Sequence, residues 1–166
     1  MIIEICSREK AAALADAVRE ATAVISITST DEQDVRFPEN GNLAAIFRLR
    51  INDLTAAFDE EGIPWGRPLP KQEDFTGLRA FLLSLRCRRL IVHCWKGASR
   101  SAAVAAAVFE FRDGADRLTT HGRFAPNPLV YALSCRELGI SPGGLHYRAV
   151  PRGLGVWALE SAPPEP

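Results

Sequence analysis

Residues 90–101 read LIVHCWKGASRS, and this stretch decides both the fold and the chemistry that the chain can carry. The residues up to His93 are apolar and β-branched, which predicts a buried strand over 89–93. The alanine-rich residues 100–112 predict a helix, and Gly97 allows a tight turn between the two elements. The sequence therefore predicts a strand, a short loop and a helix in succession, with Cys94 and Arg100 at the two ends of the loop.

Strand-like and helix-like segments alternate through the rest of the chain. Apolar runs predict strands over 1–6, 23–28 and 44–51, and helical spacing predicts helices over 8–20, 72–85 and 128–138. The last helix has Asn127 as its cap and Gly139 after its end. This order predicts an α/β fold, a single-domain sandwich in which helices flank a central, mostly parallel sheet. We expect the domain to span 1–161 and a flexible Pro-rich tail to follow at 162–166.

The composition limits the classes of function. Lys+Arg and Asp+Glu both number 20 among the 166 residues, so the formal net charge is zero. Proteins that bind nucleic acid or an anionic membrane have a basic excess. The longest wholly apolar run, 102–109, is far shorter than the roughly 20 residues that span a bilayer, and the first residues do not resemble a signal peptide. We therefore expect a cytoplasmic protein that neither binds nucleic acid nor inserts into a membrane.

Four cysteines are present, and a cytoplasmic location predicts that they are reduced. No two of them have the C-x2-C spacing of a zinc site, so we expect no metal and no cofactor. A free thiol is the expected state of Cys87, and a protective disulfide between Cys87 and Cys94 is the alternative.

The loop that follows the predicted strand 89–93 suits an anion. Backbone N–H groups of such a loop, together with the N-terminus of the next helix, bind oxyanions such as phosphate. Arg100 can add a two-pronged clamp, and the same positive field activates Cys94 as a nucleophile. Residues 75–109 contain six basic side chains and no acidic one, which makes this segment locally positive in a neutral chain.

The run His93-Cys94-x5-Arg100-Ser101 resembles the signature of Cys-based protein tyrosine and dual-specificity phosphatases, most of all their small bacterial members. The resemblance extends from about residue 23 to residue 138. It implies that Cys94 attacks phosphorus and forms a thiophosphoryl intermediate, that Ser101 assists the departing thiolate, and that His93 supports the backbone of Cys94. It also implies a set of residues that bind the phosphate: Trp95, Lys96, Gly97, Ala98, Ser99 and Arg100.

The general acid that such a reaction needs must come from another loop. Asp53 directly follows the predicted strand 44–51, so it lies at the sheet edge where the carboxyl ends of parallel strands meet. It also matches the acid position in the resemblance. Other acids of the same long loop are the alternatives: Asp59, Glu60 and Glu61.

Two other functions compete with a phosphatase that acts on phosphotyrosine and on phosphoserine or phosphothreonine. A rhodanese-like sulfurtransferase also puts a cysteine in an anion-binding loop, but it would need neither Asp53 nor Ser101. A phosphate-binding pseudophosphatase would recognise phosphoproteins without turnover. Lys96 also leaves phosphoinositides open as substrates, and the expected partner is a phosphorylated protein or a small phosphomonoester.

Overall fold

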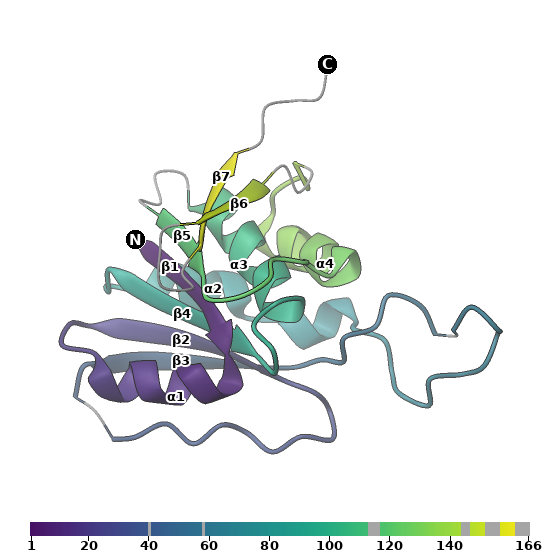
Figure 1. The fold of residues 1–166 in the computed structure, drawn as a ribbon, viewed down its shortest axis with the longest axis horizontal. Helices are drawn as coiled ribbons and strands as arrows, with labels where there is room; N and C mark the ends of the chain where they lie inside the picture. Colours follow the sequence, from purple (N-terminus) through teal and green to yellow (C-terminus); the bar gives the residue numbers. More distant parts are fainter. Residues whose placement is uncertain (40, 58, 113–116, 144–146, 152–156, 162–166) are drawn as a thin grey trace.

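A parallel sheet forms the centre of the protein in a computed structural model that describes residues 1–39, 41–57, 59–112, 117–143, 147–151 and 157–161 (Figure 1). Five strands of the described chain run parallel in the order β3-β2-β4-β1-β5. Their bounds are β1 (Ile2–Ser7), β2 (Thr22–Thr28), β3 (Leu43–Arg50), β4 (Arg89–Cys94) and β5 (Arg117–Thr120). The sheet continues past β5 with two antiparallel strands, β7 (Trp157–Ser161) and β6 (Tyr147–Pro151).

Helices cover both faces of this sheet (Figure 1). One face packs against α1 (Arg8–Ala17). On the other side lie α2 (Leu78–Ser84), α3 (Arg100–Phe111) and α4 (Pro128–Leu138), of which α3 packs directly against β1, β4 and β5. The predicted α/β fold, with a mostly parallel sheet flanked by helices, is therefore confirmed. No helix in the described ranges is long and apolar enough to cross a membrane.

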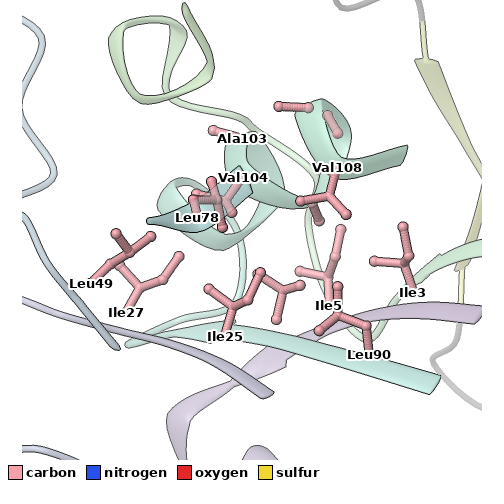
Figure 2. Packing of buried hydrophobic residues seen from close by; sticks show 14 of the residues in the cluster. Ile3, Ile5, Ile25, Ile27, Leu49, Leu78, Leu90, Ala103, Val104 and Val108 are labelled. Carbon is pink, nitrogen blue, oxygen red and sulfur yellow. The ribbon is translucent and has the colours of Figure 1, made fainter. Parts of the chain in front are cut away.

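The core lies between the parallel strands and α3. Figure 2 shows strand residues such as Ile5, Ile25 and Leu90 facing Val104 and Val108 of that helix. Every residue of α3 from 100 to 108 is buried, because α4 covers the side of the helix that faces away from the sheet. The small alanine side chains of 102–107 let the helix lie close to both neighbours, which explains the alanine-rich sequence.

Two helix predictions need correction. The predicted single helix over 72–85 is wrong: the chain forms a 3₁₀ turn, η1 (Gln72–Phe75), and then α2. Gly77 separates the two because its φ of +90° is a left-handed conformation that ends one helical segment before the next begins. The first helix ends at Ala17, three residues before the predicted end. The next residue, Val18, has an extended backbone, and its carbonyl accepts a hydrogen bond from Nδ2 of Asn42.

The other predicted elements agree with the structure to within one or two residues, and Asn127 caps α4 as expected, accepting the N–H of Val130. Three strands were not predicted, namely β5, β6 and β7. The domain limits 1–161 stay a prediction, and the predicted Pro-rich tail at 162–166 lies outside the described residues.

Parallel strands bring their carboxyl ends to one edge of the sheet. The strands β1, β2, β3 and β4 thus end close together, and the loop after β4 lies against the end of β1. A long segment leaves the same edge after β3 and extends away from the body of the molecule before η1 (Figure 1).

Gly97 is where that loop meets β1, and it carries a stability prediction. Its φ is +71°, and a Cβ placed on it would lie 2.3 Å from the carbonyl carbon of Cys6. Gly62 has a similar φ of +79° with nothing within 4 Å of an added Cβ, so it serves as the matched control. We expect Gly62→Ala to lower the free energy of unfolding by about 1–2 kcal/mol, the cost of its φ alone, and Gly97→Ala to lower it by at least about 2 kcal/mol more, because its Cβ also clashes with β1. Equal losses in urea titrations would show that the loop does not need this close approach.

Candidate active site

Cys94 is the last residue of β4, a strand that is paired on both sides by β1 and β2. The side chain is only 2% exposed, and its Sγ lies 3.1 Å from the hydroxyl of Ser101 on the first turn of α3. The thiol thus lies between the end of a central strand and the first turn of a buried helix. The predicted pairing of Cys94 with Ser101 is present in the structure.

The loop between Cys94 and α3 turns its carbonyl groups outward. The carbonyl of Trp95 accepts the N–H of Arg8 at 3.2 Å, and the carbonyl of Ala98 accepts the N–H of Ala125 at 2.9 Å. A trans peptide is planar, so the N–H groups that follow, those of Lys96 and Ser99, point to the opposite side. Neither of these two N–H groups donates to another described residue. The loop therefore offers free amide donors, as an anion-binding loop must.

The N-terminus of α3 adds to this supply of donors. Ser99 is the N-cap residue, yet its side chain caps no backbone N–H of the helix. Its hydroxyl instead donates to Oδ1 of Asp53 at 2.7 Å. The first N–H groups of α3, which have no partner within the helix, are therefore not satisfied by their own cap.

Arg100 is buried, with 4% of its surface exposed. Its Nη1 donates to the hydroxyl of Ser29 at 2.9 Å and to the carbonyl of Ile51 at 2.8 Å. Its Nε is fully buried and has no hydrogen-bond partner among the described residues. A carboxylate oxygen of Asp53 lies 3.9 Å from Nε, beyond hydrogen-bond distance. Arg100 is thus a buried cation that has one unused N–H donor and an ion pair with Asp53.

One pocket of about 340 Å³ collects most of the predicted site residues. Its walls include the following: Cys94, Arg100, Asp53, Trp95, Lys96, Ala98 and Ser99. Gly97 is the exception among the predicted phosphate-binding residues, because it lies buried against β1 and does not line the pocket. Trp95 is 54% exposed at the rim, and the guanidinium of Arg8 lies 5.6 Å from the centre of its ring.

Asp53 is fixed at the edge of the pocket. Its Oδ1 accepts the Ser99 hydroxyl at 2.7 Å and Nδ2 of Asn127 at 2.9 Å, and Asn127 also caps α4. The side chain is 38% exposed, so a substrate can reach it. The structure therefore brings Asp53 together with Cys94.

The alternative acids lie elsewhere. Asp59, Glu60 and Glu61 line a separate hollow with Trp65 on the long segment after β3. Oδ1 of Asp59 is also occupied, because it accepts the N–H groups of Glu61 and Ile63. The structure does not bring these three carboxylates to Cys94.

The four cysteines are free and buried, so Cys87 and Cys94 form no disulfide in this structure. Burial raises the pKa of Cys6 to about 12, which keeps this neighbouring thiol protonated. The described residues contain no group of three or more His, Cys, Asp or Glu that could hold a metal ion.

Several pocket residues were not predicted, namely Ser29, Glu32, Asn52 and Arg67. Ser29 directly follows β2, and the reasoning that selected Asp53 after β3 could have found it. Glu32 and Arg67 come from irregular segments whose course no periodicity indicates. The bond between Asn127 and Asp53 joins residues that are 74 positions apart, and no local pattern reveals it.

His93 is fully buried, and its Nε2 lies 2.9 Å from the hydroxyl of Ser26. Burial lowers the pKa of His93 to about 4, helped by the charges of Arg8, Arg48 and Arg100 and opposed by a bond with the backbone of Cys94. The imidazole is therefore neutral near pH 7. A neutral, buried ring behind Cys94 fits the predicted supporting role.

The lowered pKa of His93 predicts a loss of stability in mild acid. The unfolded chain takes up the proton near pH 6.5, whereas the folded protein does so only near pH 4. The stabilisation is therefore complete above pH 6.5 and is lost as the pH falls towards 4. Between pH 6.5 and pH 4 we expect the wild type to lose roughly 3 kcal/mol more of its free energy of unfolding than His93→Gln loses, because glutamine does not titrate. Parallel curves for the two proteins in urea titrations would contradict the shift.

Comparison of the chain with protein-family models, with curated proteins and with solved structures finds no match. What the pocket does must therefore be inferred from its own geometry and from the residues around Cys94.

Proposed function

We propose that the protein is a cysteine-dependent phosphatase that hydrolyses phosphomonoesters through a thiophosphoryl intermediate on Cys94. Phosphotyrosine is the first substrate class, and phosphoserine and phosphothreonine are the second. The observation that carries the proposal is Arg100, whose buried Nε has no hydrogen-bond partner among the described residues and which lines the same pocket as Cys94. A buried cation with an unpaired donor is costly unless an anion completes it, and a phosphate ester supplies that anion.

The first step transfers the phosphoryl group to sulfur. The phosphate oxygens accept hydrogen bonds from the free loop amides and from the Nε–Nη2 edge of Arg100. The third nitrogen, Nη1, is already bonded to Ser29 and Ile51. Sγ of Cys94, reacting as the thiolate, then attacks phosphorus and forms the sulfur–phosphorus bond while the bond between phosphorus and the ester oxygen breaks. Asp53 gives its proton to the leaving oxygen, which departs as a neutral alcohol or phenol.

The second step returns the enzyme to its starting state. Water attacks the phosphorus of the thiophosphoryl group while the Asp53 carboxylate accepts a proton from it. The sulfur–phosphorus bond breaks, and inorganic phosphate leaves. The Ser101 hydroxyl, 3.1 Å from Sγ, donates a hydrogen bond to the departing thiolate.

The competing functions have less support. A sulfurtransferase has no use for an acid at the position of Asp53 or for a hydroxyl at 3.1 Å from the sulfur, and both groups lie beside Cys94. A binding module without turnover has no use for a nucleophile and an acid in one pocket.

Replacement of Cys94 tests the covalent mechanism. We expect Cys94→Ser to abolish turnover of an aryl phosphate yet to keep binding of inorganic phosphate, because the amides and Arg100 remain. Cys87→Ser, which removes another buried thiol, is the matched control and should retain turnover. Comparable steady-state rates for Cys94→Ser and the wild type would refute the mechanism. Thiocyanate release from thiosulfate and cyanide, without phosphate release, would favour the sulfurtransferase instead.

Replacement of Asp53 tests the acid. Asn keeps the shape of Asp and can still accept bonds from Ser99 and Asn127, but it has no proton to give. We expect Asp53→Asn to lower kcat/KM by roughly 10²–10⁴-fold on an aryl phosphate with a basic leaving oxygen, and by less on an activated one. Asp59→Asn is the control and should be active. Loss of the rate in Asp59→Asn, Glu60→Gln or Glu61→Gln, with Asp53→Asn unaffected, would mean that another carboxyl is the acid.

A further inference from the structure

The anchor of Arg100 is made of two uncharged oxygens. Ser29 directly follows β2 and Ile51 directly follows β3, and these two strands are in register up to the pair Thr28 and Arg50. The N–H of Ile51 donates to the carbonyl of Thr28 at 2.9 Å, which continues the ladder. One residue beyond the last pair of the two strands, Nη1 of Arg100 donates to Ser29 on one side and to Ile51 on the other, and so links the ends of β2 and β3.

Ser29 is itself held firmly. It is 6% exposed, its N–H donates to Oε2 of Glu32 at 2.7 Å, and its carbonyl accepts the N–H of Glu32 at 3.1 Å. The next residue, Thr30, donates from its N–H and its hydroxyl to Oδ1 of Asn52, which follows Ile51. These bonds keep the ends of β2 and β3 together. The Ser29 hydroxyl is therefore a fixed acceptor rather than a mobile one.

This anchor has two consequences for Arg100. Because Nη1 is occupied, the guanidinium can turn only its Nε–Nη2 edge to a ligand. Because both acceptors are neutral, the anchor itself adds no negative charge beside Arg100. Two carboxylates lie in the same region: Glu32 is bonded to the backbone of Ser29, and Asp53 lies 3.9 Å from Nε. The proposed first step requires the protonated form of Asp53, and in that form the side chain has no charge to pair with Arg100.

We propose that Ser29 is a positioning residue for the phosphate-binding guanidinium. Its hydroxyl sets the orientation of Arg100 and, being neutral, leaves the full charge to the phosphoryl group in the transition state. The proposal rests on the proposed phosphatase function. It extends the site to the end of β2, a segment that supplies none of the reacting groups.

Three variants of Ser29 separate orientation from charge. Ser29→Ala removes the acceptor, Ser29→Thr keeps a hydroxyl, and Ser29→Asp keeps an acceptor but adds a negative charge. Ser134→Ala is the matched control, because Ser134 is also a buried serine whose hydroxyl bonds to a carbonyl, at 2.7 Å within α4. Steady-state kinetics with an aryl phosphate, inhibition by vanadate and urea unfolding are measured for each protein.

We expect Ser29→Ala to lower kcat by roughly 10- to 100-fold with a smaller change in KM, because a loosened guanidinium mainly loses contacts with the transition state. Ser29→Thr should recover the rate to within about threefold of the wild type. Ser29→Asp should weaken vanadate inhibition by about tenfold or more, because it pairs the charge that the anion needs. Ser134→Ala should change the unfolding midpoint but not kcat.

Different results overturn different claims. If a folded Ser29→Ala keeps kcat within about threefold of the wild type, Ser29 does not position Arg100. If Ser29→Ala does not fold, the test rests on vanadate inhibition of Ser29→Asp. Inhibition that equals that of the wild type would refute the claim that a neutral residue is needed beside Arg100. Absence of turnover in the wild type would instead refute the phosphatase function, which keeps the two failures distinct.

Discussion

The guanidinium of Arg100 is buried in the protein and is bonded through one nitrogen to the ends of two neighbouring strands. A buried charge of this kind requires good acceptors in fixed positions. Ser29 and Ile51 are in the right places only because β2 and β3 pair in the observed register. A slip of one residue would turn every side chain of the strand to the other face of the sheet and remove the anchor. The sheet register is therefore part of the site.

The remaining groups are placed by contacts with the same sheet edge. Gly97 lies against the end of β1, and the carbonyl of Trp95 accepts the N–H of Arg8, where α1 begins. Asn127 links the cap of α4 to Asp53, and Ser99 links Asp53 to the loop. Cys94, Arg100 and Asp53 thus come from β4, α3 and the segment after β3, and hydrogen bonds hold Asp53 to Ser99 before α3 and to Asn127 before α4. Such preorganisation favours transition-state stabilisation, because little reorganisation is left for the reaction.

The parts of this protein that sequence reasoning predicted are those set by short-range chemistry. The strands β2 and β4 are continuous apolar runs, and α4 has both a cap at Asn127 and a terminating Gly139. The order strand, loop, helix around Cys94 is local as well, so the sequence predicted that Cys94 and Arg100 lie at the two ends of one loop. Asp53 was found because it follows a clearly alternating strand, and parallel strand ends meet at one edge.

What could not be predicted depends on contacts between distant residues. Helical spacing in 72–85 conceals the left-handed conformation of Gly77, and the four residues of β5 are too few for a periodic pattern. Ser29 and Arg100 are 71 positions apart, and only the strand order brings them into contact.

The proposed mechanism requires that the anion bound by Arg100 is the phosphoryl group that is transferred to Cys94. The most direct test is rapid acid quenching of the wild type during turnover of an activated aryl phosphate, followed by mass measurement of the intact chain and of its peptides. We expect an added mass of one phosphoryl group on the peptide that contains Cys94, and no such addition in Cys94→Ser. Turnover without any phosphorylated protein, or with the phosphoryl group on another residue, would contradict it.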